Sequence, residues 1–293
     1  MKGFTGYHPA VQFIYYLLAV CFAMFSMHPA IILASLAGAL LFFGALNGIK
    51  SMFSELFFCF WLFLLMAMMN PLFVHNGETI LFFMNDNAIT LEAMIYGGMA
   101  SLMIVGVFLW CRCYSSILTT DKWLYLFGKT MPKIGLILSM AFRYIPLFQK
   151  QMKRINQSQK TMGLYATDSI PDRIGGGIRV FDSLIAWSME NSIDTADAMK
   201  ARGYGLPGRS NFSLFRFCKR DGILLLIMGI MSVLILLCFA KGGFEFYYYP
   251  LVAEVKLEVW NICQYLLVFV FLCIPGVIEI KEKLVWNYLK SKI

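Results

Sequence analysis

The 293-residue chain is 59% hydrophobic and only 14% charged, whereas a soluble domain carries about 25% charged residues. This composition, with a mean hydropathy of +0.69, excludes an ordinary soluble protein and indicates one that crosses the lipid bilayer several times. The 25 basic residues outnumber the 17 acidic ones, but in a membrane protein their location matters more than their excess, and we expect no nucleic acid among the partners.

Six apolar stretches approach the length of about 20 residues that a membrane-spanning helix needs. They cover residues 10–27, 29–47, 53–74, 91–111, 222–240 and 260–278. Lys2 precedes the first stretch, but more spans follow closely and no small-x-small cleavage site is convincing, so this stretch is predicted to be retained rather than removed as a signal peptide. Asn70-Pro71 and Pro275-Gly276 are expected to interrupt the third and sixth stretches near their ends.

The basic residues are concentrated between the fourth and fifth spans, in residues 112–221. Because loops rich in lysine and arginine stay in the cytoplasm, this segment is predicted to be cytoplasmic. Six spans then place both termini inside and the acidic loops 75–90 and 242–259 outside. The predicted fold is an all-α polytopic membrane protein in three parts: transmembrane helices 1–4 (residues 1–111), a cytoplasmic helical subdomain (112–221), and transmembrane helices 5 and 6 with a cytoplasmic tail (222–293).

The cytoplasmic subdomain is too long to be a simple connector, and its periodicity predicts two helices. The first runs from Ile134 to Gly163 and is expected to bend at Pro146, because proline removes a backbone hydrogen bond. Between the two helices, residues 168–179 contain Pro171 and three consecutive glycines. This composition predicts a flexible link.

The second cytoplasmic helix is predicted to begin at Ser183, with Asp182 or Ser183 as its cap, and to end at Arg202. Its apolar residues recur at helical spacing and form one stripe, made by Ile185, Met189, Ile193, Ala196 and Met199. Gly203 can adopt the left-handed conformation that terminates a helix. The pattern therefore predicts an arginine presented at a helix tip, where its charge also favours the helix dipole.

Two interpretations of Arg202 remain open from the residues alone: a solvated side chain, or a contact that docks the tip into a partner protein. The string from Gly203 to Ser210 resembles a phosphate-binding loop, but it follows a helix rather than a strand and has Arg209 where that loop needs lysine. We therefore expect no nucleotide or other cofactor to be bound by this chain.

Other chemistry is weakly represented in the sequence. His8, His28 and His75 lie far apart and are predicted to be turn or interface residues, and Cys111 and Cys113 lack the further ligands that a structural metal site needs. No nucleophile–base set appears on a span, which leaves a membrane-embedded enzyme without support. The spans also carry no ionisable residue near their centres, which argues against an ion-coupled carrier. A self-sufficient channel or carrier is nevertheless the alternative to a docking role.

Five stretches in this order resemble the transmembrane T subunit of energy-coupling factor (ECF) transporters, a type of ABC transporter. They are His8-Pro9, residues 70–77 (NPLFVHNG), residues 121–128 (DKWLYLFG), residues 139–148 (SMAFRYIPLF) and Ala201-Arg202-Gly203. The last triplet alone is unspecific, whereas the ordered set is specific and extends along nearly the whole chain.

The resemblance implies a subunit of the cell membrane that hydrolyses nothing itself. Its two cytoplasmic helices would be coupling helices that dock in two ABC-type ATPases, which bind the ATP, and its membrane part would hold a substrate-binding S subunit for uptake of vitamins or other micronutrients. The implied docking residues are Ala201, Arg202 and Gly203 at the second helix. At the first helix, Thr161, Met162 and Gly163 keep the glycine but lack the arginine, so there we expect packing contacts only.

Overall fold

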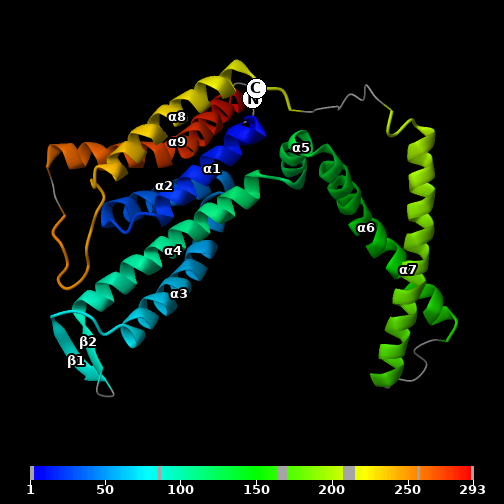
Figure 1. Ribbon diagram of the computed structural model, residues 1–293, viewed down its shortest axis with the longest axis horizontal. Helices are drawn as coiled ribbons and strands as arrows, with labels where there is room; N and C mark the ends of the chain where they lie inside the picture. The colour runs from blue at the N-terminus through cyan, green and yellow to red at the C-terminus, as the bar shows by residue number, and fades with distance from the viewer. Residues whose placement is uncertain (1–2, 85–86, 164–169, 207–214, 256–257, 292–293) are drawn as a thin grey trace. The chain divides into compact units, whose positions relative to one another are not determined.

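The computed structural model of the chain describes residues 3–84, 87–163, 170–206, 215–255 and 258–291. In these residues the fold is almost entirely helical, which confirms the predicted all-α membrane protein (Figure 1). The elements in chain order are a 3₁₀ turn η1 (Phe4–Gly6), α1 (Pro9–Met24), α2 (Pro29–Asn47), α3 (Ile49–Phe73), β1 (Ile80–Met84), β2 (Asn87–Thr90), α4 (Leu91–Ile117), α5 (Thr120–Thr130), α6 (Pro132–Thr161), α7 (Ile170–Ala201), α8 (Lys219–Ala240) and α9 (Val259–Lys290).

The chain divides into two compact units. The first unit contains Met1–Trp123 and Phe215–Ile293, and the second contains Leu124–Leu214. The second unit is therefore an insertion that begins within α5 and ends before α8.

The first unit holds the membrane-spanning helices. Within the described residues, α2, α3, α4, α8 and α9 are long and apolar enough to cross a bilayer, while α1 is an apolar helix of 16 residues. All six coincide with the predicted spans, although α3 begins earlier, at Ile49, and α4 continues to Ile117. The count of six crossings and the inside location of both termini stay predictions.

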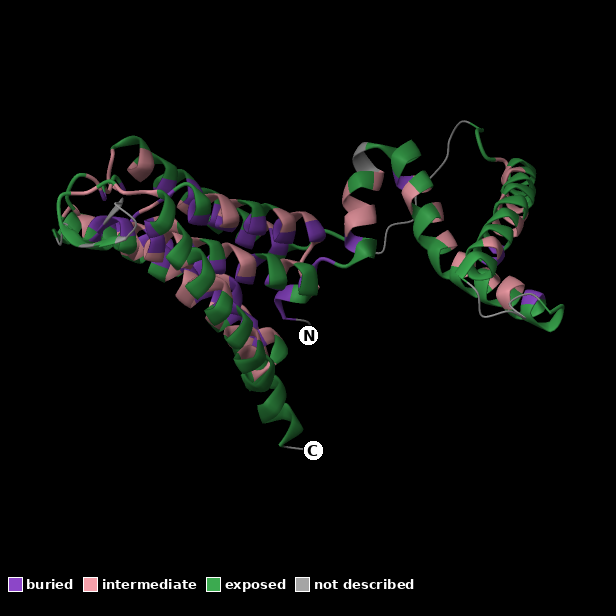
Figure 2. Cartoon of the chain, turned by 90° about the horizontal axis from the view of Figure 1, so that it is seen from below, coloured by how far each residue is buried: buried purple, intermediate pink, exposed green. Residues whose placement is uncertain are grey.

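The core of the first unit is formed where α2 packs against α9 and α4, and where α1 packs against α4 and α8. Figure 2 shows buried residues gathered along these helices. The largest buried side chains are aromatic, among them Tyr15, Tyr16, Phe42, Trp110 and Phe271. Two of their polar groups find partners inside the bundle: the Trp110 indole N–H donates to Ser35 Oγ at 3.0 Å and the Tyr15 hydroxyl donates to the Leu272 carbonyl at 3.1 Å, whereas the Tyr16 hydroxyl is buried without a partner among the described residues. These two hydrogen bonds are needed because lipid offers polar side chains no partners.

Two predicted interruptions of the spans are wrong, because α3 continues through Pro71 to Phe73 and α9 continues through Pro275 and Gly276 to Lys290. Proline is tolerated inside membrane helices when neighbouring groups replace the lost backbone contacts. Next to Pro71, the Asn70 side-chain amide donates to the Ala93 carbonyl at 2.8 Å and links α3 to α4.

Two of the three histidines lie at turns, as predicted. His8 and His28 each precede a proline at the first position of a helix, where proline is favoured, and each acts as the N-cap. The Nδ1 atom of His8 accepts the N–H of Ala10 at 3.3 Å, and Nδ1 of His28 accepts that of Ala30 at 3.2 Å. A histidine side chain therefore caps the start of both helices, and His28 does so in the tight turn between α1 and α2.

Residues 75–90, predicted only as an outer loop, contain an antiparallel hairpin in which Ile80 pairs with Thr90 and Phe83 with Ala88. The sequence signal was a run of asparagine and aspartate between two short apolar stretches, a turn composition typical of hairpins. Glu92 holds the base of the hairpin, where its carboxylate accepts the Thr79 hydroxyl at 2.7 Å. The short helix α5 was likewise not predicted as a separate element.

The second unit contains the end of α5 and two long helices, α6 and α7, that pack against each other. α6 continues through Pro146. The predicted start of the second helix at Ser183 is wrong: α7 begins at Ile170, so residues 170–179 are helical rather than a flexible link, and Asp182 and Ser183 lie inside the helix instead of capping it. Residues 168 and 169 lie outside the described residues.

The glycine triplet stays helical because apolar residues at helical spacing continue on both sides of it, and this outweighs the low helix propensity of glycine. Pro171 occupies the second helical position, where no N–H is needed, and each glycine costs only about 1 kcal/mol relative to alanine. Gly176 and Val180 are the buried residues of α7. The apolar stripe also begins earlier than predicted and comprises Ile170, Ile174, Ile178, Phe181, Ile185, Met189 and Ile193, each between 43% and 74% exposed.

Two adjacent glycines of α4 give a matched test of the packing between α3 and α4. A Cβ atom on Gly97 would lie 2.8 Å from Asn70 Cβ and 3.0 Å from the Ala67 carbonyl oxygen, whereas one on Gly98 would meet nothing within 4 Å. Overpacking predicts that Gly97→Ala destabilises the protein by about 1 to 3 kcal/mol. Gly98→Ala should be neutral or stabilise it by up to about 1 kcal/mol.

The measurement is the thermal unfolding midpoint of each variant in mild detergent. Equal midpoints for the two variants would show that α3 and α4 do not approach as closely as described.

Candidate docking surface at two helix ends

α7 ends in a Schellman motif, the paired hydrogen-bond pattern that stops a helix at a left-handed residue. The Gly203 N–H donates to the Lys200 carbonyl at 2.9 Å, and the Tyr204 N–H donates to the Met199 carbonyl at 3.0 Å. Gly203 has φ of 77°, a backbone conformation that favours glycine. The predicted end of this helix at Gly203 is confirmed.

α6 ends in the same way as far as its described residues go. The Gly163 N–H donates to the Lys160 carbonyl at 3.1 Å, the Met162 N–H donates to the Ser158 carbonyl at 3.2 Å, and Gly163 has φ of 80°. The predicted stop at Gly163 is therefore confirmed as well.

The common geometry aligns the two ends residue by residue. Lys160-Thr161-Met162-Gly163 occupies the same positions relative to its helix as Lys200-Ala201-Arg202-Gly203. The last residue before the glycine is Met162 in α6 and Arg202 in α7, while both helices carry a lysine two residues earlier. The lack of an arginine at position 162 is visible in the sequence, whereas the shared register of Lys160 and Lys200 follows from the geometry of the two helix ends.

All the side chains at these two ends are solvent-exposed. Met162 is 70% exposed and Leu206, which follows the stop of α7, is 68% exposed. Lys200 lies 3.5 Å from Asp197 in an exposed pair, an arrangement that contributes little stability. Within the described residues the Arg202 guanidinium has no ion pair, so its charge is available to an outside partner.

Contacts between α6 and α7 hold the two ends in place. The hydroxyl groups of Tyr144 and Thr195 lie 2.9 Å apart, and the Phe148 ring meets the Trp187 ring edge-on with their centroids 5.9 Å apart. Residues later in α6 thus pair with residues earlier in α7, so the helices cross in antiparallel fashion and their C-terminal ends leave the crossing in opposite directions (Figure 1).

The groups at these two helix ends are suited to binding a partner. The C-terminal end of each helix presents carbonyl groups and the negative end of the helix dipole, and the adjacent lysines and Arg202 add positive charge. An arginine can donate two parallel hydrogen bonds to a carboxylate, which lysine cannot do. The last residues of the string that resembles a phosphate-binding loop, Pro207 to Ser210, lie outside the described residues.

The fold and these exposed ends define a class: a multi-pass membrane protein with an inserted pair of crossed helices. A family model described as "Cobalt transport protein" (CbiQ) matches residues 6–214, well over half of the chain. The chain therefore belongs to the CbiQ family.

Parts of the chain are also similar to curated proteins. A protein of Listeria innocua named "Energy-coupling factor transporter transmembrane protein EcfT" is 32% identical over 35% of this chain and 40% of its own length, and one of Lactococcus lactis with that name is 30% identical over 36% and 40%. A third, from Listeria monocytogenes, is 25% identical over 59% of this chain and 69% of its own length.

The match thus spans about two fifths of the first two relatives. The family match and the five apolar helices place the chain in the cell membrane, and the relatives that it resembles are named as transmembrane proteins of energy-coupling factor transporters.

The left-handed stop of α7 can be tested directly. Gly203→Ala places a side chain at φ of 77° and brings its Cβ to 3.1 Å from Leu206 Cδ1, and the left-handed conformation costs a non-glycine residue about 1 to 2 kcal/mol. We expect the last turn of α7 to fray, seen as faster amide hydrogen exchange in residues 199–204 with little change elsewhere.

Gly177→Ala is the control for this variant. It adds a methyl group in open space inside the same helix and should slow exchange locally, because alanine favours helix by about 1 kcal/mol. Unchanged exchange at residues 199–204 in Gly203→Ala would contradict the role of the glycine.

Proposed function

We propose that this chain is the coupling subunit of an ECF-type importer. Two ABC-type ATPases bind and hydrolyse ATP, and they dock on the ends of α6 and α7. A substrate-binding S subunit lies beside the chain in the membrane, and motion of the docked helices drives its release of a vitamin or another micronutrient inside the cell. The chain itself needs no cofactor and catalyses no reaction.

The single observation that carries the proposal is the shared construction of the two helix ends. Two exposed tips with the same glycine stop, the same lysine register and opposite directions suit a two-site contact with a pair of related proteins. The relatives' name, which refers to an energy-coupling factor transporter, supports partners that supply the energy. The name of the family model refers to cobalt transport and supports a micronutrient cargo.

The surroundings of Arg202 suit a protein interface. Tyr204 is 44% and Leu206 is 68% exposed next to it. An arginine bordered by apolar side chains is the usual composition of a binding hot spot, because the apolar rim excludes water from the charged contact. We therefore propose that Arg202 binds a carboxylate in a groove of one ATPase.

The α6 end supports a weaker or different contact. Met162 stands where α7 has Arg202 and offers a flexible apolar side chain instead of a charge. Unequal ends suit two ATPases that are not identical. Thr161, Met162 and Gly163 would then pack against the second ATPase without a charged pair.

Arg202→Glu tests the main contact. Removing one partner of a buried charge pair costs about 2 to 5 kcal/mol, which corresponds to at least about a 30-fold loss of affinity, and the reversed charge adds repulsion. We expect the ATPases to dissociate from the complex purified in mild detergent and the coupled ATP hydrolysis to collapse. Arg173→Glu is the matched control, because Arg173 is exposed on the same helix but far from its tip.

Normal ATPase binding and hydrolysis in Arg202→Glu would refute the docking role. Solute flux through liposomes that contain this chain alone would instead favour the alternative, a self-sufficient channel or carrier.

Met162→Arg tests the second tip by adding the side chain that α7 has at the same position. If the groove on the second ATPase also carries a carboxylate, the new charged hydrogen bonds should tighten binding by about tenfold, measured as retention of the ATPases during dilution of the complex. Weaker binding would show that this groove is adapted to an apolar side chain.

A further inference from the structure

The inserted helices α6 and α7 are connected to the first unit at two places. The chain leaves the first unit after Trp123 and returns to it at Phe215. Within the first unit, the residues beside both places contact one short stretch near the N-terminus, residues Phe4–Phe13, which contains η1 and the first turn of α1. We call this stretch the N-terminal joint.

Lys122 fixes the joint on the outgoing side. Its side chain is only 8% exposed, and its Nζ atom donates to the Thr5 carbonyl at 3.0 Å, to Gln12 Oε1 at 2.9 Å and to the Ile117 carbonyl at 3.0 Å. An ammonium group has three N–H donors, and a buried one is tolerated only when it is paired in this way. The contacts therefore tie the start of α5 to η1, α1 and the end of α4.

Two neighbours extend the contact on this side. The Gln12 amide donates to the Phe4 carbonyl at 2.6 Å, which joins the two ends of the joint to each other. The Trp123 ring packs edge-on against Phe13, with centroids 5.5 Å apart. A displacement of the chain at Trp123 thus acts on both a polar and an aromatic contact to α1.

Asp221 fixes the joint on the returning side. It is 3% exposed, and its Oδ1 atom accepts the His8 N–H at 3.1 Å while Oδ2 accepts the Cys218 N–H at 2.8 Å. The same carboxylate therefore caps α8 and holds the backbone at the start of α1. The His8 ring contacts Phe217 edge-on, with centroids 5.3 Å apart, and Arg220 lies over the Tyr7 ring.

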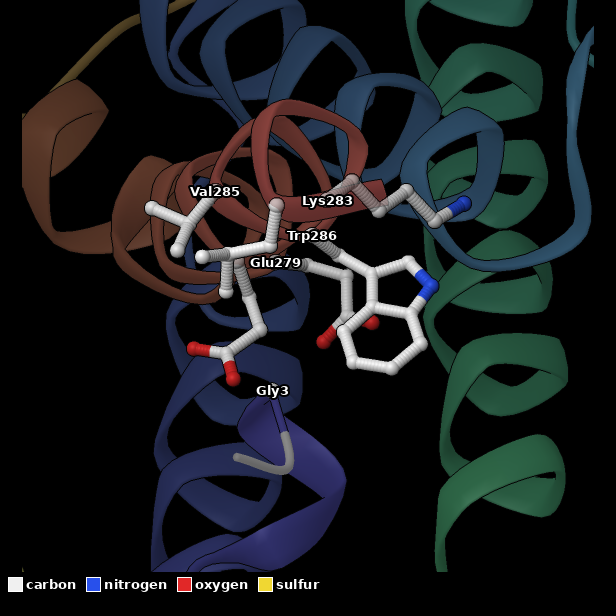
Figure 3. A pocket seen from close by; sticks show the side chains of 7 residues that line it. Gly3, Glu279, Lys283, Val285 and Trp286 are labelled. Carbon is white, nitrogen blue, oxygen red and sulfur yellow. The ribbon is translucent and has the colours of Figure 1, made fainter. Parts of the chain in front are cut away.

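The joint is in turn fixed to the membrane bundle. The Phe4 N–H donates to Glu279 Oε2 on α9 at 2.9 Å, and the Phe4 ring packs against Tyr15 and against Phe42 of α2. Figure 3 shows Glu279 and Gly3 lining one pocket with Lys283, Val285 and Trp286. The joint therefore connects α1, α2, α5, α8 and α9.

We propose that residues Phe4–Phe13 are the joint through which movement of residues 124–214 reaches α1, α2 and α9, with Lys122 and Asp221 as its positioning residues. This inference rests on the proposed function, because it assumes that ATPases move the inserted helices. Both connections to the insertion end in a buried charged group bonded to this stretch. A shift of either connection must move the stretch or break those hydrogen bonds, and moving it carries the attached helices along.

The experiment is amide hydrogen exchange on the complex with its ATPases and the co-purifying S subunit. Exchange is compared between ADP and a non-hydrolysable ATP analogue, in the wild type and in Lys122→Met and Asp221→Ala. In the wild type we expect nucleotide to change exchange both in α6 and α7 and in residues 4–13, by on the order of tenfold, a typical strength of coupling between sites. In each variant the change should persist in α6 and α7 but be lost in residues 4–13.

Glu55→Gln is the control. Glu55 forms a two-pronged pair with Arg112, whose Nη2 lies 3.1 Å from Glu55 Oε2, and this pair links α3 to α4 without touching the joint. The control variant should keep the wild-type response. If Lys122→Met does not assemble, Asp221→Ala carries the test.

The outcomes separate this inference from the proposed function. No nucleotide response in α6 and α7 of the wild-type complex would overturn the proposed function. A response there without one in residues 4–13, or the same response in both variants as in the wild type, would overturn the joint alone. Variants that exchange faster throughout the chain with an unaltered nucleotide response would assign Lys122 and Asp221 a stabilising role only, which also contradicts the joint.

Discussion

The structure depends on one constraint: a chain this apolar must satisfy its backbone hydrogen bonds internally, because lipid offers no partners. Helices meet that demand along their length but leave four N–H and four carbonyl groups open at their ends. The informative residues of this protein accordingly lie at helix ends. His8 and His28 cap the first two membrane helices, Asp221 caps α8, and Gly163 and Gly203 close the two inserted helices.

The same constraint explains how much the sequence could predict. The membrane helices follow from hydropathy, and the stops at Gly163 and Gly203 follow from the need for a left-handed residue, so these predictions are confirmed. The start of α7 was predicted wrongly, since glycine and proline composition was given more weight than the apolar spacing that continues back to Ile170. The hairpin after α3 was missed because its strands are only five and four residues long.

The contacts of Lys122 could not be predicted from the sequence. The oxygen atoms that accept its hydrogen bonds belong to residues 5, 12 and 117, and no periodicity distinguishes this lysine from the many solvated ones around it. Only the fold brings these oxygens together. Arg202, by contrast, could be predicted from its local sequence pattern, and the structure adds the shared register of Lys160 and Lys200 and the exposed apolar side chains beside Arg202.

The exposed stripe of α7 has a consequence for the life of the chain before assembly. Seven large apolar side chains from Ile170 to Ile193 lie on one helix and remain accessible to solvent, and soluble surfaces rarely carry so extended a patch. A copy of the chain on its own therefore exposes an apolar surface of the kind that marks an interaction site and, left uncovered, promotes aggregation.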